Sequence, residues 1–130
     1  MPSYKFRILI DTTDDEEVFR DILISGTSDF ETFYLAIIKA FDFRGDQLAS
    51  FYVSNEQWDK GHEIALMDMG MGSSLDSPSI MKETPIAQMV NDHDQKFILV
   101  YDFLKMWCFL IELVEEVEEE VSEPQVDLAM

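Results

Sequence analysis

A long apolar segment near the C-terminus constrains the fold more than any other feature of the sequence. It reads FILVYDFLKMWCFLIELV, runs from Phe97 to Val114 and contains three formal charges, at Asp102, Lys105 and Glu112. A transmembrane helix needs about 20 predominantly apolar residues, and a charge near the bilayer centre costs about 2.5 kcal/mol or more. No basic cluster flanks the segment to orient it. These features argue against a membrane span.

Two paired strands explain the same segment better. Residues 97–101 and 107–114 are rich in β-branched and aromatic side chains, and the polar Asp102 and Lys105 lie between them. This pattern predicts two apolar strands joined by a short turn, with the charges at the bend and near the far end. We therefore expect a buried hairpin at the centre of a sheet.

Length and composition are typical of one folded domain. The chain has 130 residues, of which 47% are hydrophobic, so it is long enough to bury a core without cross-links. Charges interrupt the N-terminal segment from Lys5 onward, so it does not resemble a signal peptide. Cys108 is the only cysteine, and no intramolecular disulfide is possible. These observations predict a cytoplasmic protein, with Cys108 as a core thiol.

The charge of the chain is strongly acidic. The formal net charge is −18, from 27 acidic and nine basic residues. Eight of the 27 acids lie from Glu112 onward, which leaves 19 acids against nine bases in the preceding body. Nucleic acids and anionic membranes attract basic surfaces, so the charge argues against both as direct ligands. It allows a partner protein with a basic surface.

The first third of the sequence predicts a hairpin and a helix. Tyr4–Ile10 alternates as a strand, and Val18–Ser25 forms a second strand after a polar turn. So short a connection favours antiparallel pairing. Apolar residues then recur at helical spacing over Asp29–Phe41, after a capping box formed by Ser28 and Glu31.

The remaining segments complete the predicted fold. Strands are expected at 51–53 and 63–66, a mobile Met-, Gly- and Ser-rich loop at 67–83, and a short helix at 84–89. The predicted fold class is α+β, with a mostly antiparallel sheet and one main amphipathic helix packed on one face. Its order is β-grasp-like, β-β-α-β followed by α-β-β. Residues 1–114 are expected to form a single domain. Residues 115–130 are expected to form an acidic tail that is either a frayed helix or disordered.

No set of residues predicts catalysis or a cofactor. Met67, Met69 and Met71 are spaced as in some copper(I) sites, but no Cys or His lies beside them, and a loop whose methionines dip into the core or into a partner's groove explains them better. His62 and His93 lie in polar turns, and no zinc-binding spacing accompanies them. We therefore expect no catalytic residue, metal or cofactor.

Trp58 is a large aromatic residue in a polar stretch, SNEQWDKGHE. Such a residue either anchors a partner or covers the edge of the core. The candidate partner-binding residues combine Trp58 with the methionine loop and the acidic tail: Trp58, Met67, Met69, Met71, Glu115, Glu116, Glu118, Glu119 and Glu120.

The order of several short segments resembles the plasmid pRiA4b ORF-three-like family. That family has a Trp-Arg second strand, a Gly before a helix that ends Ala-Phe-Gly-Trp, and a late Asp-Phe-Gly-Asp-Asp-Trp-Glu-His hairpin. The corresponding segments here are Val18–Ile22, Gly26, Lys39–Phe43, Leu48–Phe51, and Tyr101–Phe103 with Trp107, within a resemblance that covers Tyr4 to Leu113.

The departures from the family pattern lie in the hairpin. Leu104, Lys105 and Met106 replace Gly-Asp-Asp, and Cys108 and Phe109 replace Glu-His. The resemblance therefore implies the family's α+β scaffold and a prokaryotic origin, without a polar or metal-binding hairpin. The leading hypothesis is a non-catalytic protein-interaction module. The alternatives are a small-ligand or enzyme module with a pocket near 67–71, and an acidic nucleic-acid mimic that uses the glutamates of the tail.

Overall fold

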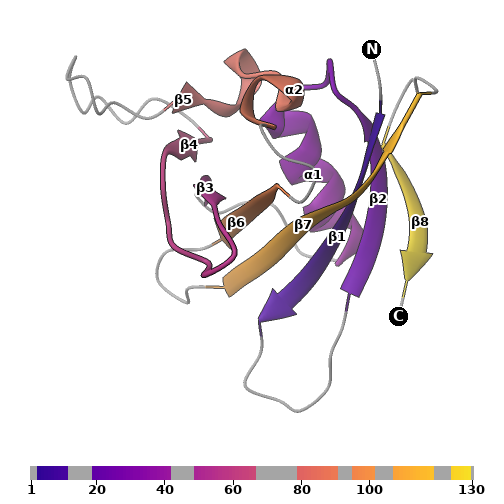
Figure 1. The fold of residues 1–130 in the computed structure, drawn as a ribbon, viewed down its shortest axis with the longest axis horizontal. Coiled ribbons are helices and arrows are strands. Elements are labelled where there is room, and N and C mark those ends of the chain that lie inside the picture. The colour runs from indigo at the N-terminus through magenta and orange to yellow at the C-terminus, as the bar shows by residue number, and fades with distance from the viewer. Residues whose placement is uncertain are drawn as a thin grey trace.

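One eight-stranded sheet organises the chain (Figure 1). The structure, a computed structural model, describes residues 3–11, 19–41, 49–66, 79–90, 95–101, 107–118 and 124–129. Its elements are, in order, β1 (Ser3–Asp11), β2 (Phe19–Ser25), α1 (Phe30–Ala40), β3 (Ala49–Ser54), β4 (Glu63–Ala65), β5 (Ser79–Ile80), the 3₁₀ helix η1 (Met81–Glu83), α2 (Ile86–Met89), β6 (Lys96–Tyr101), β7 (Trp107–Val117) and β8 (Gln125–Ala129).

The apolar segment near the C-terminus supplies the two central strands. The strand order is β5-β4-β3-β6-β7-β1-β2-β8, and β6 pairs antiparallel with β7 over the whole length of β6. The predicted pair of buried strands is therefore confirmed, although the turn at 102–106 lies outside the described residues. No helix in the described part of the chain is long and apolar enough to cross a membrane.

The core lies between the sheet and α1, as alternation along the strands requires. Phe6 and Ile8 of β1 and Phe97 of β6 are fully buried on the face that meets the helix. The helix contributes its apolar stripe, and the Phe33 ring stacks on Phe51 of β3 with the ring centroids 5.5 Å apart. Aromatic pairs of this kind add about 0.5–1.5 kcal/mol beyond the burial of their area.

The start of α1 differs in detail from the prediction. Asp29, rather than Ser28, is the N-cap, and its Oδ1 accepts a hydrogen bond of 2.8 Å from the backbone N–H of Thr32. Ser28 instead donates its backbone N–H to the carbonyl oxygen of Ser25, in the turn after β2. An aspartate at this position satisfies a free helix N–H and places negative charge at the positive end of the helix dipole.

Arg20 connects β2 to the end of α1. Its Nε donates to the carbonyl oxygen of Ala40 at 3.3 Å, and its guanidinium lies 5.2 Å from the centroid of the Phe41 ring. Phe41 in turn packs edge-on against Phe109 of β7. A cation at a helix C-terminus interacts favourably with the dipole, so Arg20 stabilises the docked position of the helix.

The predicted fold class is wrong. The prediction was an α+β fold with one main helix on a mostly antiparallel sheet in a β-grasp-like order. The two α-helices contain only eleven and four residues, whereas the sheet has eight strands and is mixed, because β4 and β5 pair in parallel. The prediction failed because strands as short as β5 leave no periodic signal, and because sheet order depends on contacts between distant segments.

The end of the chain also differs from expectation. A frayed helix or a disordered tail was expected after Val114, but β7 continues to Val117 and β8 pairs antiparallel with β2. Within the expected loop at 67–83, residues 79–83 form β5 and η1, and 67–78 lie outside the described residues. The short helix is present as α2, with Pro85 as its N-cap residue.

Candidate interaction surface

The face of the sheet opposite α1 carries a set of side chains that the core does not use. Because side chains alternate along a strand, Arg7 and Leu9 point away from the face that buries Phe6 and Ile8. Residues directly opposite on paired strands share this side. We call this surface the open face. Its central members are Arg7, Leu9, Phe19, Asp21, Lys96, Ile98, Leu110 and Glu112, of which Asp21 and Ile98 are buried.

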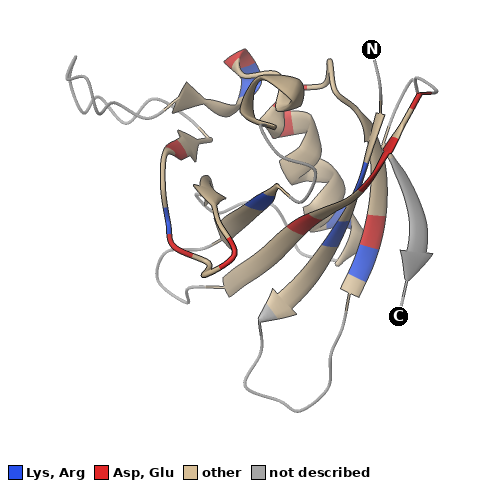
Figure 2. Ribbon diagram, viewed as in Figure 1, with Lys and Arg blue, Asp and Glu red and all other residues tan. Residues whose placement is uncertain are grey.

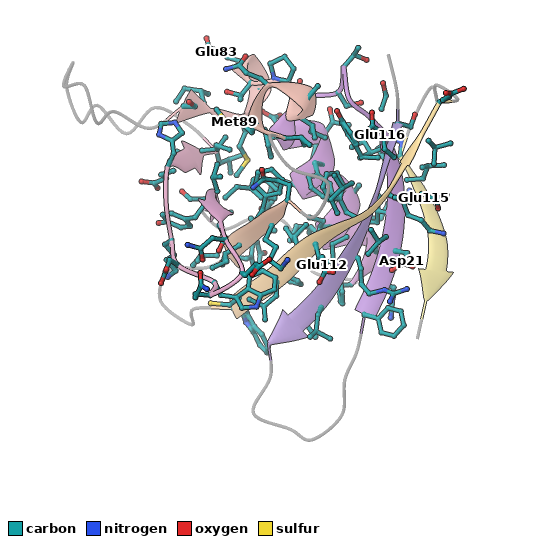
Figure 3. All side chains as sticks on the ribbon, in the orientation of Figure 1. Asp21, Glu83, Met89, Glu112, Glu115 and Glu116 are labelled. Atoms are coloured by element: carbon teal, nitrogen blue, oxygen red, sulfur yellow. The ribbon has the colours of Figure 1, made fainter. Side chains whose placement is uncertain are left out.

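Four charged residues form a row across the open face. Lys96 of β6 lies opposite Glu112 of β7, Glu112 lies opposite Arg7 of β1, and Arg7 lies opposite Asp21 of β2. The signs alternate along these four neighbouring strands. Figure 3 labels Glu112 on β7 and Asp21 on β2. We call this set the charge row; opposite charges on adjacent strands each contribute about 0.2–1 kcal/mol.

The pair at one end of the charge row is the tightest. Arg7 donates from Nε and Nη2 to the two carboxylate oxygens of Asp21, at 2.9 and 3.0 Å. The Asp21 side chain is only 2% exposed, whereas that of Arg7 is 48% exposed. The hydrogen bonds to Asp21 raise the pKa of Arg7, and the nearby charges of Asp21 and Glu112 act in the same direction. The pair therefore presents a fixed positive group at the surface, above a buried carboxylate.

An apolar row runs beside the charge row. Ile98, Leu110, Leu9 and Phe19 lie opposite one another in that order on β6, β7, β1 and β2. Leu110 and Phe19 are partly exposed. The guanidinium of Arg7 lies 4.8 Å from the centroid of the Phe19 ring, so the two rows are in contact.

Trp58 borders the open face on the side of β3. It closes the turn between β3 and β4 by donating its backbone N–H to the carbonyl oxygen of Asn55. The Asn55 side chain accepts from the N–H groups of Gln57 and Asp59, which fixes the turn. The Trp58 ring is half-buried, and the Lys96 ammonium lies 5.9 Å from its centroid. The structure thus places Trp58 at the end of the charge row.

The first residues of the predicted acidic tail belong to β7. Glu115, Glu116 and Glu118 are exposed at the end of this strand (Figure 2). Burial raises the pKa of the Tyr4 hydroxyl, and the Glu116 charge raises it further. We call Glu115, Glu116 and Glu118 the acidic strip. The other predicted glutamates, Glu119 and Glu120, lie outside the described residues, as do Met67, Met69 and Met71.

The polar contacts around β4 are local links between strands. His62 Nε2 lies 2.8 Å from Ser79 Oγ, and Ser50 donates to Glu63 at 2.6 Å. Burial raises the pKa of Tyr52, with a further contribution from the Glu63 charge. In the part of the chain that the structure describes, no three His, Cys, Asp or Glu side chains are arranged to hold one metal ion. His93 lies outside that part.

Sequence reasoning missed the charge row. Alternation along Tyr4–Ile10 already directs Arg7 away from the core face, and Asp21 is a lone acid within an apolar strand. Neither signal reveals that the two residues meet, because that depends on the β1–β2 register. The register of β7 against β1 and β6 then adds Glu112 and Lys96.

Comparisons with known proteins give a matching family model and a similar fold. A family model described as "Plasmid pRiA4b ORF-3-like protein" matches residues 2–128. The crystal structure of MM3350, a protein of unknown function from Methanosarcina mazei Go1, superposes with a TM-score of 0.80 at 16% sequence identity, over 98% of this chain and 69% of that one. At this identity the likeness shows a common fold. The search of curated proteins found no significant match.

Proposed function

The chain belongs to the plasmid pRiA4b ORF-3-like family, and from this premise we propose that it works as a non-catalytic protein-interaction module. Its partner is a protein with a basic surface, and the contact is made by the acidic strip. A cytoplasmic location is part of the proposal. It is supported by the single cysteine, which is typical of a reducing compartment.

The observation that carries the proposal is the position of the acidic strip on an ordered strand. Glu115 and Glu116 lie in the part of β7 that pairs with β1, opposite Lys5 and Tyr4, and Glu118 directly follows the strand. Carboxylates on a strand lose less conformational freedom on binding than carboxylates on a disordered tail. The chain as a whole carries a net charge of −18, which attracts a basic surface and speeds the encounter.

The test compares two variants of equal charge. In E115Q/E116Q/E118Q the acidic strip is neutral, and in E31Q/E56Q/E83Q three acids on other elements are neutral. Both tagged variants and the wild type are used to capture proteins from a bacterial lysate, and the captured proteins are quantified by mass spectrometry. We expect a basic protein that wild type and the E31Q/E56Q/E83Q control retain, that the strip variant loses, and that salt elutes.

Two results would contradict the proposal. Equal capture by the two variants would mean that net charge, and not the acidic strip, attracts the partner. A thermal-shift screen that finds one metabolite or nucleotide stabilising the protein by several degrees, together with no strip-dependent capture, would favour a small-ligand module instead.

A further inference from the structure

The charge row has a property that neither the family nor the proposed function requires. It contains four charges in the order plus, minus, plus, minus, from Lys96 through Glu112 and Arg7 to Asp21. If the order of these four charges is reversed, each position in the row carries the opposite sign. A second copy of the same row, turned end for end, is therefore complementary to the first.

We propose that the open face binds a second copy of this chain, face to face, about a two-fold axis that runs along the strands between β7 and β1. Rotation about this axis reverses the order of strands and leaves the position along each strand unchanged. Glu112 then faces Arg7 of the second copy, and Arg7 faces Glu112. At the outer ends, Lys96 lies over β2 of the second copy, where the Asp21 carboxylate is buried and paired with its own Arg7. Such an interface is isologous, as two-fold dimers are.

The partly exposed members of the apolar row obey the same operation. Leu110 faces Leu9 of the second copy, and Phe19 lies over β6 of the second copy, where Ile98 is buried. Packed sheets lie about 10 Å apart, so these side chains meet between the two sheets. The apolar row contributes buried apolar area to the interface. The charge row fixes the alignment of the two copies, because a shift by one strand would place like charges opposite each other.

Arg7 is able to serve both its own chain and the second copy. A guanidinium has five N–H donors, and Asp21 receives hydrogen bonds from Nε and Nη2. The side chain is also 48% exposed while it makes this contact. The Asp21 pair fixes the orientation of Arg7, so little rotamer freedom remains to be lost when it meets Glu112 of the second copy.

Net charge opposes association of two copies that each carry −18. At an ionic strength of about 0.15 M the Debye length is about 8 Å, so this long-range repulsion is largely screened while contacts within the interface are screened less. The dimer should therefore weaken when salt is lowered. Attraction between unlike charges alone would produce the reverse dependence.

The first test uses two charge reversals with the same change in net charge. Glu112→Arg places an arginine opposite Arg7 of the second copy, whereas Glu83→Arg alters an exposed acid in η1, away from the open face. Sedimentation velocity at about 0.15 M salt measures the dissociation constant of each protein. We expect E83R to dimerise at least as tightly as wild type, and E112R to dimerise at least about tenfold more weakly. A monomeric wild type at high protein concentration, or equal values for E112R and E83R, would overturn the proposal.

The second test depends on the two-fold geometry itself. Leu110→Glu and Leu9→Lys each place an uncompensated charge in the apolar row, so each variant alone should be monomeric. When L110E and L9K are mixed, the introduced carboxylate of one copy meets the introduced ammonium of the other. The unchanged Leu9 of the first copy still meets the unchanged Leu110 of the second, so a heterodimer should form.

The control for this rescue is Leu23→Lys, which also lies on the open face but not opposite position 110, so it should not rescue L110E. Circular dichroism establishes that all three variants are folded before they are mixed. Rescue by L23K, or no rescue by L9K among folded variants, would exclude this arrangement.

Discussion

Trp58 has a backbone conformation that few residues of its size adopt. Its φ of 60° lies in the left-handed region, and among the described non-glycine residues no other φ is positive. A residue with a Cβ pays about 1–2 kcal/mol there. The hydrogen bonds of Asn55 to the turn, and the Lys96 ammonium over the indole ring, offset this strain. The partly buried Trp58 ring borders the open face beside Lys96, and its role in binding a partner stays a prediction.

A matched pair of substitutions at Trp58 separates strain from packing. Trp58→Ala and Trp58→Gly both remove the ring, but only alanine keeps the Cβ that the left-handed conformation penalises. We expect W58G to be more stable than W58A by about 1 kcal/mol, the reverse of the order in ordinary strand positions. Urea unfolding of the two variants measures the difference. A more stable W58A would show that residue 58 is not held in this conformation.

Two tyrosines should make the free energy of unfolding depend on pH in the alkaline range. Burial raises the pKa of Tyr4 and Tyr52 above 10.0, and Glu116 and Glu63 respectively add to this effect. A hydroxyl with a raised pKa in the folded state ionises more readily in the unfolded state. Its contribution to stability is therefore complete below pH 10.0 and declines as the pH rises further. We expect the free energy of unfolding to fall above this pH, and to fall less steeply in Tyr4→Phe/Tyr52→Phe. Equal slopes for the two proteins, measured by urea unfolding at each pH, would refute this.

At the scale of elements, sequence patterns revealed neither β5 nor β8, and β8 is the longer of these two strands. It has five residues and follows a glutamate-rich stretch, so neither length nor periodicity marks it. In the structure it pairs with Arg20–Leu23 of β2, with one irregularity in register, and completes one side of the sheet. Without it, β2 would be an edge strand beside the Arg7–Asp21 pair. A segment that composition assigns to a solvated tail is therefore part of the sheet.

Truncation after Pro124 tests the role of β8. Removing 125–130 leaves the donors and acceptors of β2 that face β8 unpaired, and exposed strand edges pair with other chains. We expect a lower midpoint of thermal unfolding than wild type and more light scattering on heating. The control is Asp127→Asn, which removes the one acidic side chain of the deleted segment but keeps the segment itself. An unchanged midpoint in the truncated protein would mean that β8 contributes nothing to stability.

For the whole molecule, the dominant energetic feature beyond the core is self-repulsion. A net charge of −18 on 130 residues disfavours the compact state, because folding brings the carboxylates closer together. Exposed ion pairs contribute only about 0–1 kcal/mol each, and the Arg7–Asp21 pair, whose carboxylate is buried, is screened little by salt. Repulsion between many exposed acids should therefore dominate the response of stability to salt.

The salt dependence of stability tests this balance. We expect the free energy of unfolding to increase as sodium chloride is raised from about 0.02 to 0.3 M, as the Debye length shortens from roughly 20 to 6 Å. The increase should be smaller in E115Q/E116Q/E118Q, which has three fewer negative charges. Urea unfolding at low protein concentration keeps self-association out of the measurement. A fall in stability with salt would show that specific ion pairs dominate.

Much of the local structure could be read from single stretches of sequence. Alternation marked β1, and 3.6-residue periodicity marked the helix that includes Phe33 and Ile37. The apolar segments on either side of Asp102 marked β6 and β7, and the family resemblance is confirmed by the match over residues 2–128. The fold class failed because short strands leave no such pattern. The candidate surface was only partly anticipated, through Trp58 and the glutamates of β7.

The sequence by itself determined which of the longer segments become strands or helix and which face of each is apolar, because those properties depend on neighbours a few residues apart. Tertiary structure alone decided that β1 lies between β7 and β2, and that β8 closes against β2. Strand order and register are set by contacts between segments far apart in the chain, and one step in register turns every side chain to the other face. For that reason Lys96, Glu112, Arg7 and Asp21 become one alternating row only in the folded protein.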